Sequence, residues 1–156
     1  MVDKMSNSER EVSDISEAID ILSRADTVRL GLYAEPYPYV VPVSFGFELV
    51  DGQIDLYFHG AMKGRKYDLI QKNPMACIEV DIFHRYIQVP GSFSTEFESF
   101  IGYGQIQLVT GEEAARGLNL LCAHCGFGGF DYDCEILNLT AVYRIRLDSW
   151  TGKRLL

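Results

Sequence analysis

The chain has 156 residues, enough for one domain, and its 47% hydrophobic and 23% charged residues are an ordinary globular composition. Its formal net charge of -8 at pH 7 argues against nucleic acid and anionic membranes as partners. No apolar run approaches the ~20 residues that a membrane helix needs, and the first residues are polar. We therefore expect a cytoplasmic protein with a flexible tail, residues 1–13, and a single domain, residues 14–156.

The first expected element is a short helix after the tail. Apolar residues recur with helical spacing between residues 15 and 22, and Asp14 or Ser16 is available to cap the helix start. The segments 27–33 and 37–49 are then rich in β-branched and aromatic residues and are separated by a turn-like stretch that contains Pro36. These two segments predict a β-hairpin.

A third strand is expected after the tight-turn dipeptide Asp51-Gly52, because residues 53–58 alternate between apolar and polar side chains. Residues 60–73 change to a helical period, and Asn73-Pro74 ends the segment. This region therefore predicts a strand followed by a short helix.

The second half of the chain returns to strand patterns. Gly102 and Gly104 lie inside one of these strands and indicate a bulge or a sharp bend, as barrels need at corners. The expected strands are 75–82, 98–110 and 142–147, and the expected helix is 112–125. Together with the first three strands, this order predicts an α+β fold built on an antiparallel six-stranded barrel with inserted short helices.

One segment concentrates positive charge in this acidic chain. Lys63, Arg65 and Lys66 follow the glycine at position 60, where the third strand passes into the helix start. Free backbone N–H groups at a helix N-terminus favour an anion, and a guanidinium binds two phosphate oxygens at once. The segment is typical of a phosphate site. The alternative is that the three cations lie on a solvated helix turn and bind no ligand, because short clusters of charge usually are solvated.

Four cysteines raise the question of a metal site. Cys122 and Cys125 are three positions apart in a predicted helix, with His124 between them, whereas structural zinc sites usually need four ligands from two separated pairs. Cys77 and Cys134 form no second pair of that kind. We expect reduced thiols that pack in the fold and no metal site; zinc binding and redox pairing are the alternatives.

The segment 57–69 reads Tyr-Phe-His-Gly-Ala-x-x-Gly-Arg-Lys-x-Asp-Leu, and Asn73-Pro74 follows it. It resembles the flavin-phosphate segment of the pyridoxamine 5'-phosphate oxidase-like FMN-binding split barrels. Within that superfamily, the His-Gly-Ala form together with the segment 41–47 is most similar to the nitroimidazole-resistance proteins. The substrate-phosphate motif of the true pyridoxamine phosphate oxidases is not recognisable after Trp150, so vitamin B6 oxidation is not expected.

This resemblance implies a split-barrel homodimer with one flavin in each of two clefts at the subunit interface. The cofactor would be FMN, with FAD as the alternative. The residues that match the family's flavin-binding positions are Pro42, Val43, Ser44 and Phe45 along the isoalloxazine, Phe58, His59, Gly60 and Ala61 beside the cofactor, and Arg65 and Lys66 at its phosphate. For Phe45 and Phe58, the alternative is a place in the barrel core.

His59 matches a histidine that lies near the flavin ring in the nitroimidazole-resistance group, so the resemblance implies a catalytic role for it. A neutral imidazole there could bind the flavin or the substrate, or donate a proton. The expected activity is an FMN-dependent reduction of a small-molecule electron acceptor such as a nitroaromatic. The alternative is a flavin- or cofactor-binding module without turnover, used as a carrier or sensor.

Overall fold

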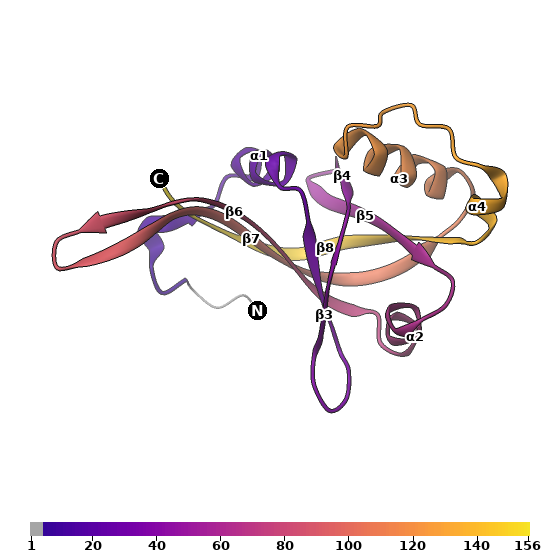
Figure 1. Cartoon of the computed structure of the whole chain (residues 1–156), viewed down its shortest axis with the longest axis horizontal. Helices are drawn as coiled ribbons and strands as arrows, with labels where there is room; N and C mark the ends of the chain where they lie inside the picture. Colours follow the sequence, from indigo (N-terminus) through magenta and orange to yellow (C-terminus); the bar gives the residue numbers. More distant parts are fainter. Residues whose placement is uncertain (1–4) are drawn as a thin grey trace.

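The computed structural model describes residues 5–156, which form a curved antiparallel sheet with helices inserted between its strands (Figure 1). The sheet has eight strands in the order β3-β2-β6-β7-β8-β5-β4, and β1 pairs with β8. The strands are β1 (Glu11–Val12), β2 (Val28–Leu32), β3 (Tyr39–Val43), β4 (Gly46–Val50), β5 (Gln53–Ala61), β6 (Met75–Val89), β7 (Ser92–Val109) and β8 (Thr140–Leu155). The helices are η1 (Ser8–Arg10), α1 (Ile15–Arg24), α2 (Arg65–Lys72), α3 (Gly111–His124) and α4 (Cys134–Asn138).

The connection between β3 and β4 closes the sheet into a barrel. These strands are the two ends of the strand order, yet only Ser44 and Phe45 separate them in the chain. A connection this short holds the two edges together, so the sheet must curl. Because β3 and β4 do not pair with each other in the described strand order, the barrel stays split at this point. The expected α+β antiparallel split barrel is therefore confirmed.

The apolar faces of the strands fill the barrel, and α1 closes one side of it. The Asp14 side chain caps α1 by accepting a hydrogen bond from the Ser16 N–H at 2.8 Å, as the sequence predicts. The fully buried members of this core include Ile21 and Leu22 of α1, and Leu30, Phe45, Leu56, Phe58, Ile78, Phe100 and Ile145. In the part of the chain described, 5–156, no helix has the length and apolar character needed to cross a membrane.

Helix α3 covers the other face of β4 and β5 at very close range (Figure 1). A Cβ at Gly117 would lie 2.4 Å from the Tyr57 ring, and a Cβ at Gly46 would lie 2.3 Å from the Leu121 nitrogen. Both positions therefore require glycine for the helix to pack against the sheet. Tyr57 is fully buried beneath α3 in a second, smaller apolar cluster.

The structure has eight strands where six were expected. The predicted strand 37–49 is two strands, because the chain breaks at Ser44 and turns Phe45 into the core. The other addition is β1, in which Glu11 and Val12 pair with the end of β8. This places the last part of the expected tail, 1–13, in the sheet, whereas residues 1–4 of that tail lie outside the described residues.

The glycines of β7 mark an irregularity, as expected. The register between β7 and β8 shifts between Tyr103 and Gly104. A Cβ at Gly104 would lie 2.3 Å from the Arg146 carbonyl oxygen, so the two backbones approach more closely than a side chain permits. Of the predicted bulge or sharp bend, the structure shows an irregularity in the strand pairing, as a bulge produces.

Strands β6 and β7 extend beyond the barrel as a long hairpin, which projects at the left of Figure 1. Their pairing continues to Val89 and Ser92, so both strands are longer than the predicted 75–82 and 98–110. Outside the barrel there is no core to impose alternation, and the hairpin exposes aromatic rings instead. Its most exposed rings are Phe83, Tyr86 and Phe93, at 54%, 70% and 73%.

Candidate functional site

The candidate site begins where β5 ends and α2 starts. Gly64 precedes α2 with a φ of 104°, in the left-handed region that favours glycine, and no side chain caps the helix. The first bond within the helix runs from the Asp68 N–H to the Gly64 carbonyl. The N–H groups of Arg65, Lys66 and Tyr67 therefore have no acceptor inside the helix and are available to an anion.

Lys66 carries its ammonium group back over the end of β5. The Lys66 Nζ lies 5.9 Å from the centroid of the Phe58 ring and 2.9 Å from the point that a Cβ on Gly60 would occupy. Burial lowers the pKa of Lys66, and no carboxylate among the described residues offsets that effect. A half-buried ammonium without a carboxylate is a group that a bound anion would stabilise.

Arg65 lies beside Lys66 and joins α2 to the edge of the sheet. Its guanidinium carbon is 5.1 Å from the centroid of the Tyr39 ring on β3, and within the described chain it forms no ion pair. Arg24 and Arg146, in contrast, are both bonded to carboxylates. Tyr39 was not predicted as part of the site, because it lies in a different strand and no local pattern links it to Arg65.

His59 lies near the end of strand β5, a few residues before the cationic segment. It pairs with Val142 on β8 and, by the alternation of a strand, leaves β5 on the opposite side from Phe58 and Gly60. Its Nδ1 is buried and has no hydrogen-bond partner among the described residues. Burial, and to a smaller extent the Lys66 ammonium, lowers the pKa of His59, so the imidazole is neutral at pH 7.

The remaining sequence-predicted residues divide into two groups. Pro42 and Ser44 are exposed and Val43 is half-buried, at the end of β3 opposite to Tyr39, the residue that Arg65 contacts. Gly60 and Ala61 lie at the end of β5, beside Lys66. The structure thus brings the start of β3, the end of β5 and the start of α2 together, and it shows no contact of Pro42, Val43 or Ser44 with the two cations among the described residues.

Phe45 and Phe58, on the other hand, belong to the barrel core. Both side chains are 0% exposed. Phe45 packs against the His124 ring with centroids 4.3 Å apart, and Phe58 stacks on Tyr143 at 4.9 Å. Both residues therefore take the alternative position, in the barrel core, and support the site from inside the barrel.

These features fit the phosphate end of a flavin. Two cations without carboxylate partners, Arg65 and Lys66, adjoin an uncapped helix start, and Gly60 leaves the space that the Lys66 ammonium occupies. The unpartnered Nδ1 of His59 is a further polar group for which the described residues supply no partner. An anionic ester would satisfy the two cations and the free N–H groups, whereas the buried His59 Nδ1 lies on the other side of β5.

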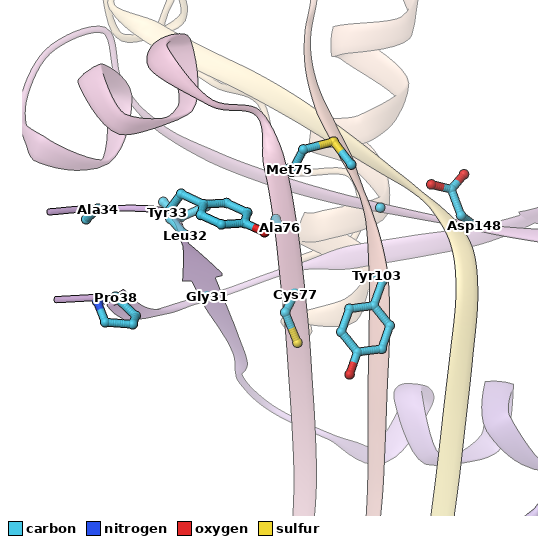
Figure 2. A pocket seen from close by; sticks show the side chains of 11 residues that line it. Gly31, Leu32, Tyr33, Ala34, Pro38, Met75, Ala76, Cys77, Tyr103 and Asp148 are labelled. Carbon is cyan, nitrogen blue, oxygen red and sulfur yellow. The ribbon is translucent and has the colours of Figure 1, made fainter. Parts of the chain in front are cut away.

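A cavity of about 420 Å³ lies elsewhere, on the outer face of β2, β6 and β7. Figure 2 shows the Tyr33 and Tyr103 rings on either side of the β6 segment that carries Ala76 and Cys77. Burial, with a smaller contribution from Glu79, raises the pKa of the Cys77 thiol. None of the sequence-predicted site residues lines this cavity.

The thiols of α3 lie apart from the candidate site. Cys122 is buried and donates a hydrogen bond to the Tyr132 hydroxyl at 3.2 Å, while Cys125 and Cys134 are exposed. Burial and the neighbouring Cys122 raise the pKa of Tyr132 to about 12. Between residues 5 and 156, no group of three or more His, Cys, Asp or Glu side chains is arranged to hold a metal ion.

Comparison with known proteins finds solved structures that share this fold. The chain is similar to a proposed 5-nitroimidazole antibiotic resistance protein from Bacteroides thetaiotaomicron, with 28% identity, a TM-score of 0.81, and coverage of 92% of this chain and 85% of that one. It shares the fold of a flavocytochrome from Azotobacter vinelandii, with 18% identity, a TM-score of 0.82, and coverage of 98% and 72%.

A FAD and heme binding protein from Mycobacterium smegmatis also has this fold, with 19% identity, a TM-score of 0.78, and coverage of 93% of this chain and 73% of that one. No match was found among curated proteins. The family model described as pyridoxamine 5'-phosphate oxidase matches residues 14–154. With nearly all of its residues matched by that model, the chain belongs to the pyridoxamine 5'-phosphate oxidase family.

Proposed function

We propose that the chain is a flavin-dependent oxidoreductase that binds the flavin phosphate at the start of α2. The observation that carries this proposal is the pair of cations, Arg65 and Lys66, that have no carboxylate partner among the described residues and adjoin free N–H groups. Arg65 would bind the phosphate through its planar guanidinium, and Lys66 would bind it as a point charge from the β5 side. The first turn of α2 would add backbone donors.

The flavin ring would lie between the β3 edge and the end of β5. Pro42, Val43 and Ser44 offer an exposed to half-buried strand edge for one side of the ring. His59, Gly60 and Ala61 would lie on the other side. Phe45 and Phe58 would support this region by packing in the core beneath it, since neither side chain is exposed and so neither can contact the flavin.

The proposed reaction is the reduction of a small acceptor such as a nitroaromatic. When bound, the flavin supplies the electron transfer, so the protein needs only to bind, orient and shield it. The neutral His59 would hold or pass one proton at its ring nitrogen. The 28% identity to the proposed nitroimidazole resistance protein supports this class of acceptor, and FMN is the simplest cofactor that fills the phosphate site.

The protein would act as a homodimer. Its outer sheet face exposes apolar side chains around the cavity of Figure 2, among them Tyr33 at 66% and Tyr103 at 46%. Val40 adds to this face from β3, at 62% exposed. A continuous apolar face of this kind is typical of a subunit interface, and a second copy of the chain would cover it.

The test is the absorption spectrum of the purified protein, followed by addition of NADH or NADPH. We expect a yellow protein whose visible bands bleach with a reduced nicotinamide and return when a nitroaromatic or quinone is added. Mass spectrometry of the released cofactor identifies it. A protein that binds no added flavin would refute the proposal, and one that binds flavin without turnover would be a carrier or sensor instead.

A further inference from the structure

Two thiols at the end of α3 open into one small cavity. Its volume is about 250 Å³, and none of the residues proposed for the flavin site lines it. We name it the dithiol cavity. One of its thiols, Cys122, is 4% exposed, whereas the other, Cys125, is exposed. The cavity is lined by Leu121, Cys122, Cys125, Phe127, Phe130 and Tyr132.

The spacing of the two cysteines permits a disulfide between them. Cys122 and Cys125 are three positions apart, so both side chains project from one face of α3. In a regular helix, the Cα atoms of such residues are about 5 Å apart, within the range of about 4.4 to 6.8 Å that disulfides span. Their Cβ atoms, about 5 to 6 Å apart, would have to approach by about 1 to 2 Å. Because Cys125 is the residue at which the helix ends, this approach involves only the last turn of α3.

The chain that follows α3 folds aromatic rings around the thiols. Gly126 has a φ of 84°, in the left-handed region, and the Phe127 N–H donates back to the Cys122 carbonyl at 2.8 Å. The Phe127 and Phe130 rings meet edge to face at 6.4 Å, and the Phe130 and Tyr132 rings do so at 5.1 Å. The cavity is therefore enclosed by apolar rings, and its lining carries no charged side chain.

The Tyr132 hydroxyl positions the buried sulfur. It accepts a hydrogen bond from the Cys122 thiol at 3.2 Å. Burial first, and then Cys122 and Cys125, raise the pKa of Tyr132 to about 12, so the hydroxyl keeps its proton at neutral pH and lies near both sulfurs. Once Cys122 has lost its proton, the same hydroxyl can donate its own to that sulfur.

His124 lies between the two cysteines in the sequence but does not join them in the structure. Its Nε2 lies 2.7 Å from the Ala25 carbonyl oxygen, and its ring packs against Phe45 in the barrel. Two sulfurs without this imidazole do not complete a structural zinc site, which usually has four ligands. The arrangement favours redox chemistry of the thiols over metal binding.

We propose that Cys122 and Cys125 form a dithiol site that exchanges with small, uncharged disulfides. The Cys125 thiolate attacks one sulfur of a disulfide R–S–S–R, forms a bond to it and displaces R–S⁻, which takes up a proton. Cys122 then loses its proton, and its Sγ attacks the Cys125 Sγ and displaces the second R–S⁻. In sum, the two protein thiols are oxidised to one disulfide and R–S–S–R is reduced to two R–SH. An excess of thiol reverses both steps.

The experiment treats the full-length protein with bis(2-hydroxyethyl) disulfide at about pH 8.5, where thiolates are present. The exchange is quenched at successive times, the remaining thiols are blocked with N-ethylmaleimide, and mass spectrometry of the intact protein and its peptides follows each cysteine. We expect Cys125 to gain a hydroxyethylthio group first and to lose it as the disulfide with Cys122 forms. Dithiothreitol should restore both thiols.

Variants separate the two steps. Cys122→Ala should stop at the mixed disulfide on Cys125, and Cys125→Ala should leave the buried Cys122 free. Tyr132→Phe should leave the first step unchanged and slow the second about three- to tenfold, because it removes only the hydrogen bond to Cys122. Cys134→Ser is the matched control, since it removes an exposed thiol outside the cavity and should form the internal disulfide at the wild-type rate.

A wild type in which Cys122 and Cys125 both stay free after Cys134 has reacted would overturn the inference. A lasting mixed disulfide on Cys125, or a disulfide between Cys125 and Cys134, would also overturn it. If Cys122 reacts at the wild-type rate in Cys125→Ala, Cys125 is not the attacking thiol and the assigned order is wrong. Because Cys122 is buried, Cys122→Val is made beside Cys122→Ala, and the wild-type result decides the pairing even where a variant does not fold. None of these outcomes depends on flavin binding.

Discussion

The Lys66 ammonium lies 2.9 Å from the point that a Cβ on Gly60 would occupy. The ammonium can take this position only because residue 60 has no side chain. Gly60 has no left-handed backbone that would require glycine, and the space beside it is filled by the end of the Lys66 side chain. The relationship ties the end of β5 to the start of α2. It explains why a small residue and a cation occur together at this site.

Gly60→Ala should move the Lys66 ammonium away from the phosphate site. Because only the flexible end of a side chain has to move, we expect an unchanged fold and a weaker affinity for FMN, by about three- to tenfold. Riboflavin, which has no phosphate, should bind as before. Fluorescence titrations with both ligands measure the effect, and Gly128→Ala is the control, because its added methyl would meet only the Ala123 Cα, at an ordinary contact distance of 3.9 Å. Equal losses for FMN and riboflavin would show that the methyl disturbs the ring site instead.

His59→Ala should leave most of the FMN affinity intact but change the rates of reduction or reoxidation, because the imidazole is assigned to the ring and not to the phosphate. Stopped-flow absorbance of the loaded protein measures both rates. If both rates match the wild type, His59 is a structural residue. The protonation of His59 provides a separate check by NMR titration. Lys66→Met should raise the His59 pKa only in part, since burial lowers it more than the Lys66 charge does.

Glu98→Gln should destabilise the protein at neutral pH. The Glu98 carboxylate is 1% exposed, accepts two bonds from Arg24 at 2.7 and 2.8 Å, and lies 2.9 Å from the His84 Nε2. These partners, Arg24 first, lower the Glu98 pKa to about 2, so the carboxylate contributes stability above its unfolded pKa and loses it as pH falls toward 2.

We expect Glu98→Gln to reduce the free energy of unfolding at pH 7 by about 2 kcal/mol. Urea denaturation at pH 7 and at pH 3 measures the difference, which should shrink at the lower pH. A difference that stays constant between these pH values would mean that the charge of Glu98 does not stabilise the fold.

A homodimer should sediment at twice the 17.6 kDa mass of the chain. Tyr103→Glu places a charge in the apolar outer face and should shift the protein toward monomer. Leu49→Glu is the control, because Leu49 is exposed to a similar extent but lies on β4, outside the cavity of Figure 2. Sedimentation velocity at micromolar concentration distinguishes the two variants. A wild type that sediments as a monomer and binds FMN tightly would exclude a shared cleft.

The sequence predicts the elements whose signals are local. The cap at Asp14, the Asp51-Gly52 turn and the irregularity at the β7 glycines are each fixed by neighbouring residues, and the structure confirms all three. The break at Ser44 was missed because residues on both sides of it favour strands. It depends on closing the barrel, which is a property of the whole sheet.

The candidate site divides in the same way. The cations Arg65 and Lys66 and the nearby Gly60 are close in sequence, so their pattern is visible without a structure. The contact between Arg65 and Tyr39 depends on segments distant in the chain, and no local pattern reveals it. Side-chain burial likewise depends on the packed structure, which is why Phe45 could be assigned to the core only there.

The most direct test of the flavin assignment is a titration of the apoprotein with FMN and with riboflavin, in the wild type and in Arg65→Ala. A charge-assisted hydrogen bond contributes about 1.5 to 3 kcal/mol, so Arg65→Ala should bind FMN roughly ten- to a hundredfold more weakly. Its affinity for riboflavin should not change, and Lys72→Ala, which removes a cation from the far end of α2, should not affect either ligand. An Arg65→Ala protein that binds FMN as tightly as the wild type would contradict the assignment of Arg65 to a flavin phosphate site.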